Sequence, residues 1–79
     1  MATKTAPKLE SVERILDEVD EWYARVHKIR QKLGRLRRGS EAYLDLLPDL
    51  WVELDVLSRK AQYAAEILDE YMESLPEDE

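Results

Sequence analysis

Two runs of apolar residues, each advancing in steps of three and four, dominate the pattern along the chain. The first run is Val12, Ile15, Val19, Trp22, Val26, Ile29, Leu33 and Leu36; the second is Tyr43, Leu47, Leu50, Leu54, Leu57, Ala61, Ala64, Leu68, Tyr71 and Leu75. Such steps place side chains on one face of an α-helix and are typical of a heptad seam. The pattern predicts two helices, over about residues 8–38 and 41–75, packed along their lengths.

The two runs meet at Gly39 and Ser40. Glycine suits the left-handed residue that follows a helix, and serine suits an N-cap. Because so short a connection makes neighbouring helices antiparallel, we expect an all-α fold, a coiled-coil-like two-helix hairpin over residues 7–75. It would lie between a disordered tail at 1–6 and an acidic tail at 76–79. Matching the seams, within about one turn, brings Trp22 near Leu54 and Ile15 near Ala61.

Pro48 is the irregular position of the second helix, because an internal proline removes a hydrogen bond and clashes with the preceding turn. Two outcomes are consistent with the sequence. The helix is kinked at Pro48, or it is broken there, with Asp45 as the N-cap of the longer part and Pro48 in its first turn.

The second helix carries more apolar surface than one neighbour covers. Val52, Val56, Tyr63 and Ile67 fall within about 60° of one another at 100° per residue and form a second stripe. Trp51 on this helix and Tyr23 on the first one widen the seam. A 79-residue chain without cysteine also has little core and no disulfide. We therefore expect a partner or oligomer interface at these six residues, and a homodimer that forms a four-helix bundle.

Charge is segregated along the chain, whose net charge is −6. Residues 25–38 hold seven bases and no acid, and the exposed end of this run is a basic turn at Arg35, Arg37 and Arg38. The far end of the second helix carries an acidic surface, made of Glu66, Asp69, Glu70 and Glu73. This acidic surface fits the basic turn of a second, antiparallel copy, or a basic surface of another protein, including one that normally holds nucleic acid.

Few residues suggest catalysis. His27 is the single histidine and is expected to be a solvated surface residue, and no nucleophile elbow or glycine-rich phosphate loop is present. Neighbouring acids such as Asp17, Asp20 and Glu21 leave open a carboxylate-bridged metal site in a dimer. By the heptad count most of them point away from the seam, so we expect no enzyme, no metal and no cofactor.

The sequence thus favours a non-enzymatic protein–protein interaction module, acting through the apolar stripe and acidic surface of its second helix. In length and composition the chain resembles short acidic helical proteins such as phage-encoded inhibitors and bundle-forming regulators, although no motif carries that resemblance. A small regulator or inhibitor of this type would block a basic or nucleic-acid-binding surface. The alternative is a nucleic-acid-associated protein that uses the basic turn of a dimer, which the acidic net charge disfavours. We expect a cytoplasmic protein, since no stretch has the eighteen or so apolar residues of a membrane span.

Overall fold

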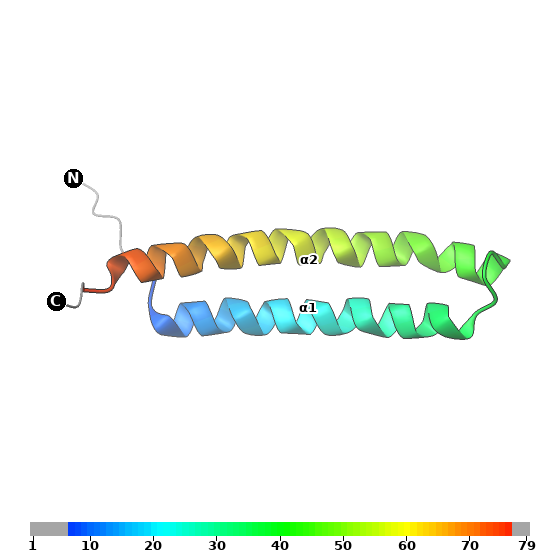
Figure 1. Cartoon of the computed structure of the whole chain (residues 1–79), viewed down its shortest axis with the longest axis horizontal. Helices are drawn as coiled ribbons and strands as arrows, with labels where there is room; N and C mark the ends of the chain where they lie inside the picture. The colour runs from blue at the N-terminus through cyan, green and yellow to red at the C-terminus, as the bar shows by residue number, and fades with distance from the viewer. Residues whose placement is uncertain (1–6, 77–79) are drawn as a thin grey trace.

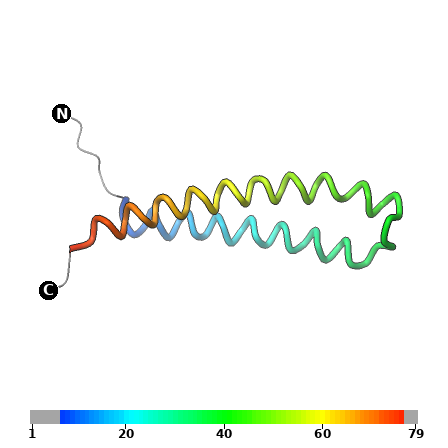
Figure 2. The backbone as a smooth tube through the Cα atoms, turned by 45° about the horizontal axis from the view of Figure 1, so that its top comes forward, coloured from blue at the N-terminus to red at the C-terminus, as the bar shows by residue number. Residues whose placement is uncertain are grey.

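The computed structural model describes residues 7–76 and shows two long helices joined by a short turn (Figure 1). Helix α1 spans Leu9–Arg35 and helix α2 spans Glu41–Ser74. They lie side by side and antiparallel in a rod of 58 × 28 × 18 Å. Figure 2 shows that they cross at a shallow angle, as packed helices do when their side chains interdigitate.

The predicted all-α helical hairpin is confirmed. The predicted tails lie outside the described residues, except for Pro76, which follows α2 without helical structure.

Helix α1 ends earlier than the sequence suggested. Gly34 lies in its last turn and, with no side chain to restrict the backbone, weakens the helix there. Leu36 then turns to an extended conformation, with φ −98° and ψ 151°, while its N–H still donates to the Leu33 carbonyl at 3.1 Å. The helix boundary is therefore Arg35, and the two arginines that follow belong to the connection.

The connection is a β-turn over residues 37–40. The Ser40 N–H donates to the Arg37 carbonyl at 3.0 Å, and Gly39, in the third position, has a φ of 74°. A positive φ at the third position is the requirement of a type II turn and explains glycine there. The Ser40 hydroxyl accepts a hydrogen bond from the Tyr43 N–H at 3.2 Å, so Ser40 is the N-cap of α2.

Helix α2 runs through Pro48 without a break. The alternative in which Asp45 caps a separate helix is therefore wrong. Pro48 has no N–H to offer the carbonyl of Leu44, one turn earlier, and both residues are exposed, so water can reach that carbonyl. The helix keeps its continuity at the cost of one hydrogen bond on its solvent side.

The core is small. Among the described residues only Val12, Ile15, Val26 and Ala64 are buried, and each lies on the face between the helices. Three of them sit in the half of the hairpin away from the turn, where a small residue on α2 meets larger ones on α1. Most other residues of the contact are half-buried, since each helix has a single neighbour.

Candidate interaction surface

The contact between the helices uses a different face of α2 from the one the strongest apolar run suggested. On α1 the expected seam is buried or half-buried throughout, from Val12 to Leu36. On α2 the half-buried or buried positions that follow heptad steps are Tyr43, Leu46, Leu50, Glu53, Leu57, Lys60, Ala64, Ile67 and Tyr71. Leu47, Leu54, Ala61 and Leu68, expected to face α1, are exposed instead. The face of α2 that contacts α1 is thus rotated by one residue from the expected one. Glu53 and Lys60 occupy it where Leu54 and Ala61 were expected.

These two charged residues are paired with α1. Lys60 Nζ lies 2.7 Å from Glu18 Oε1, and Glu53 Oε1 lies 3.8 Å from a guanidinium nitrogen of Arg25. Both pairs join residues at the same height of an antiparallel hairpin. Extending the register of these two pairs places Trp22 level with Leu57 and Ile15 level with Ala64. This differs from the predicted neighbours Leu54 and Ala61 by about one turn, which is within the margin of that prediction.

Trp22 lies at the centre of this charged cluster. Its ring has the Arg25 guanidinium 4.3 Å and the Lys60 ammonium 4.7 Å from its centroid. A cation near an aromatic face is attracted by the ring quadrupole and gains about 0.5 to 2 kcal/mol. Within the described residues, however, Trp22 Nε1 and Glu53 Oε2 are buried without a hydrogen-bond partner, which carries a cost. The contact between the helices is therefore partly polar, and two of its polar atoms lack a hydrogen-bond partner.

The most regular apolar row of α2 faces solvent. Leu44, Trp51 and Met72 each expose more than half of their surface, and Leu54 and Leu75 nearly half. The row advances in steps of three and four along the whole helix; we call it the α2 stripe, made of Leu44, Leu47, Trp51, Leu54, Ser58, Ala61, Ala65, Leu68, Met72 and Leu75. At 100° per residue its centre lies about 100° around the helix from the face that contacts α1. It is a second heptad seam without a neighbour among the described residues.

A shorter apolar row of α1 lies on the same side of the hairpin. The row consists of Leu9, Leu16 and Tyr23, spaced by seven and all exposed. Leu16 and Tyr23 each follow a residue of the α1 seam by one position, and the α2 stripe likewise follows the α2 face that contacts α1 by one position. In antiparallel helices an equal rotation in the chain direction leads to the same side, so the two rows share a side of the hairpin. Together the two rows form what we call the apolar face.

The six interface residues that the sequence suggested do not share one side of the hairpin. Trp51 and Tyr23 belong to the apolar face, and they are the most exposed of its large residues, at 67% and 63%. Val52 and Tyr63 are exposed on other parts of α2, whereas Val56 and Ile67 are half-buried. Ile67 lies on the α2 face that contacts α1. Four of the six therefore lie off the apolar face.

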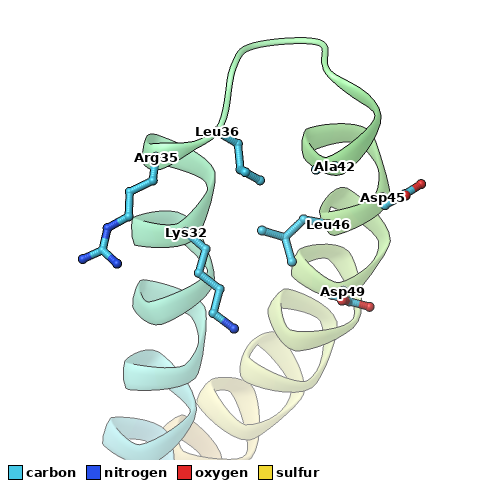
Figure 3. A pocket seen from close by; sticks show the side chains of 7 residues that line it. All are labelled: Lys32, Arg35, Leu36, Ala42, Asp45, Leu46 and Asp49. Carbon is cyan, nitrogen blue, oxygen red and sulfur yellow. The ribbon is translucent and has the colours of Figure 1, made fainter.

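The charged surfaces lie at opposite ends of the hairpin. In the acidic surface Glu66, Asp69 and Glu73 are exposed and Glu70 is half-buried, all near the end of α2. In the basic turn Arg35, Arg37 and Arg38 are exposed. Figure 3 shows Asp45 and Asp49 pointing away from α1 and Arg35 pointing away from α2, so these acids do not pair with that arginine.

A groove opens between the helices beside the turn (Figure 3). Leu36 and Leu46 extend toward one another across it, with Ala42 beside them and Lys32 along its edge. The helices are joined there by large, half-buried side chains without a fully buried one. Lys32, Asp45 and Asp49 each precede a residue of the helix–helix contact by one position, so the groove lies on the side of the hairpin opposite the apolar face.

The acids and the histidine of the described residues do not gather into a group that could hold a metal ion. Across residues 7–76 no group of three or more His, Asp or Glu side chains is placed to hold a metal ion. His27 is exposed, lies 3.4 Å from the Gln31 amide nitrogen, and stacks on Tyr23 with ring centroids 6.4 Å apart. Such contacts between residues one turn apart are ordinary on a helix surface. The apolar face is therefore the candidate functional feature.

Comparison with family models, with curated proteins and with solved structures finds no match to the chain. In the part of the chain that the structure describes, neither helix is long and apolar enough to cross a bilayer.

Proposed function

We propose that the protein is a non-enzymatic interaction module that binds a helical surface of another protein molecule through its apolar face. The observation that carries the proposal is the placement of residues on α2. The side that contacts α1 contains Glu53 and Lys60, whereas the side exposed to solvent carries an almost uninterrupted heptad row. Exposed apolar patches of this size mark interaction sites in soluble proteins.

The small size of the hairpin supports the same conclusion. Domains below about 70–80 residues rarely gain more than about 3–5 kcal/mol from one core and generally need a metal, a disulfide or association. This chain has no cysteine, and its described residues bury four side chains. Covering the apolar face would add the missing burial.

The acidic surface would select the partner. Glu66, Asp69 and Glu73 border the far end of the α2 stripe and remain available for ion pairs with a basic surface. Charge at the rim of an apolar contact sets association rate and specificity more than affinity. A regulator or inhibitor that covers a basic or nucleic-acid-binding surface of a cytoplasmic protein would work in this way.

A comparison of captured proteins tests the proposal. Tagged wild-type chain and a Trp51→Glu variant would be incubated with an extract that also contains untagged chain, and the retained proteins quantified by mass spectrometry. Val52→Glu is the matched control, because Val52 is adjacent in sequence and half exposed, at 51%, but lies outside the stripe. We expect the wild type and the control to retain a protein that the Trp51→Glu variant does not retain. The untagged chain counts as such a protein. Identical retention by all three would contradict the proposal.

The nucleic-acid alternative has one supporting observation. The exposed Arg37 and Arg38 adjoin a polar groove lined by Arg30, Gly34 and Tyr43. Clustered arginines bind phosphates without sequence preference and with strong dependence on salt. A gel-shift titration with duplex DNA and with RNA at low salt tests it; absence of a shift at high micromolar protein would exclude this use of the basic turn.

A further inference from the structure

We infer that the apolar face binds a second copy of this chain turned end for end, so that two hairpins form a four-helix bundle with their α2 helices side by side and antiparallel. This inference rests on the proposed function, because it names the occupant of the same face. It is carried by the geometry of α2, the order of side chains along the α2 stripe, and the charges of α1.

The geometry of α2 matches a corner position in a four-helix bundle. A helix at the corner of such a bundle contacts two neighbours, whose directions differ by about 90°. The α2 stripe and the face that contacts α1 are about 100° apart around the helix axis. One face is occupied by α1, so the stripe is placed where the second neighbour of a corner helix would lie.

The order of residues along the stripe is complementary to itself when reversed. Placing Leu44 of one copy opposite Leu75 of the other aligns the whole row. The remaining layers then pair Leu47 with Met72, Trp51 with Leu68, Leu54 with Ala65, and Ser58 with Ala61. The two-fold axis passes between Ser58 and Ala61, where small residues allow close approach, and the large residues lie away from it. Sliding one copy by a heptad would leave either Met72 and Leu75 or Leu44 and Leu47 of each copy without a partner.

The charges of α1 favour the antiparallel orientation. Residues 9–21 of α1 hold six acids and one base, and residues 25–38 hold seven bases and no acid. When the α2 helices pair in reverse, the α1 helices also lie in reverse. The basic segments of the two copies then lie at opposite ends of the bundle, and residues 17–21 of both copies lie near the two-fold axis. A parallel pairing would place acids beside acids and bases beside bases. Like charges facing one another oppose association, so the parallel dimer is disfavoured.

The area of the apolar face is sufficient for a stable dimer. Its ten large residues, seven on α2 and three on α1, expose between 37% and 67% of their surface. With roughly 200 Å² per large apolar residue, they present on the order of 1,000 Å² per copy, compared with about 800 Å² per partner in a standard interface. Helix α1 of a second copy would not match the stripe as well, because its exposed row holds three apolar residues and then continues with Arg30.

Sedimentation equilibrium of the purified full chain is the first test. We expect a dimer at tens of micromolar for wild type and for the Val52→Glu control. Trp51→Glu buries two charges per dimer, so we expect its dissociation constant to rise on the order of a hundredfold or more, with an unchanged helical circular dichroism spectrum. A wild-type monomer at several hundred micromolar, or a Trp51→Glu dimer as tight as wild type, would overturn the inference.

Distances between spin labels test the orientation without altering the apolar face. The chain has no cysteine, so Asp45→Cys and Gln62→Cys each accept one label per copy at an exposed site outside the stripe. In the antiparallel register the two labels at position 45 are separated by about 45 Å along the axis, at 1.5 Å per residue, and those at position 62 by less than about 25 Å in all. Short distances at both positions would show a parallel dimer and overturn the inference.

The outcomes separate this inference from the proposed function. A chain that stays monomeric when pure, but still captures another protein in a manner that Trp51→Glu abolishes, would contradict the second copy as occupant and support the interaction module. A dimer that depends on Trp51, with a long distance at position 45 and a short one at position 62, would support both.

Discussion

Lys60 on α2 and Glu18 on α1 form an ion pair across the hairpin, with 2.7 Å between Nζ and Oε1. Both side chains are partly shielded, and the Lys60 ammonium also lies over the Trp22 ring. A seam of aliphatic residues tolerates displacement by a heptad, whereas a charged pair at one height does not. The pair therefore fixes the register of α1 against α2. Because it requires Lys60 to point toward α1, it also favours the rotation of α2 that leaves the α2 stripe exposed.

Replacing Lys60 with alanine should reduce the free energy of unfolding by about 1 kcal/mol, because the ion pair, the cation–π contact and the packing of the lysine stem are all lost. Urea denaturation at one fixed protein concentration measures the effect. Arg59→Ala is the control: Arg59 pairs with Asp55 on its own helix at 3.0 Å, but its side chain is 79% exposed. It should change stability by less than about 0.5 kcal/mol. Equal losses in both variants would show that Lys60 does not fix the register.

The two tryptophans should respond differently to concentration. Trp22 is half-buried and lies close to two cations of its own hairpin, whereas Trp51 lies in the α2 stripe and is 67% exposed. In a Trp22→Phe variant, where Trp51 alone emits, fluorescence should shift to shorter wavelength as the chain associates, because the indole leaves water. In Trp51→Phe the emission of Trp22 should stay constant over the same range. A shift confined to Trp22 would mean that association alters the contact between α1 and α2 and leaves the α2 stripe in water.

Ala64 is the one buried residue of α2 and lies at the height of Ile15. Enlarging it to leucine should destabilise the hairpin by about 1–3 kcal/mol, because the helices must separate to admit the larger side chain. Ala24→Leu, on the exposed side of α1, should have almost no effect. Thermal unfolding followed by circular dichroism compares them. An unchanged or raised melting temperature for Ala64→Leu would mean that the helices are not closely packed there.

Replacing Pro48 with alanine should stabilise the protein by up to about 3 kcal/mol, since the new N–H can bond to the Leu44 carbonyl and the clash with the preceding turn is removed. Pro48 is exposed, so no packing is lost. Urea denaturation and helical circular dichroism give the change. Loss of stability would indicate that proline has a role in shaping α2 beyond its own hydrogen bond.

Much of the fold follows from the sequence, because heptad spacing, Gly39 and Ser40 specify helices and turn locally. The seam of α1 is correct for the same reason: its apolar residues occupy a single face. Helix α2 has two apolar faces about 100° apart, and apolarity alone favours the one with Leu47 and Leu54. The structure places Glu53 and Lys60 against α1 instead. The ion pairs that make this possible join residues far apart in sequence, so the pattern of one helix could not reveal them, although the seven-residue spacing of Leu46, Glu53, Lys60 and Ile67 carried a signal.

The distribution of buried residues also has a kinetic consequence. Val12, Ile15 and Ala64 lie far from the turn, whereas the residues beside the turn are only half-buried and border a groove. Closing the turn therefore brings the helices together before it yields much burial, and the largest gain comes when the first half of α1 packs against the second half of α2. We expect folding in one cooperative step and not progressive zippering from the turn, with backbone amides of both helices acquiring protection from hydrogen exchange together.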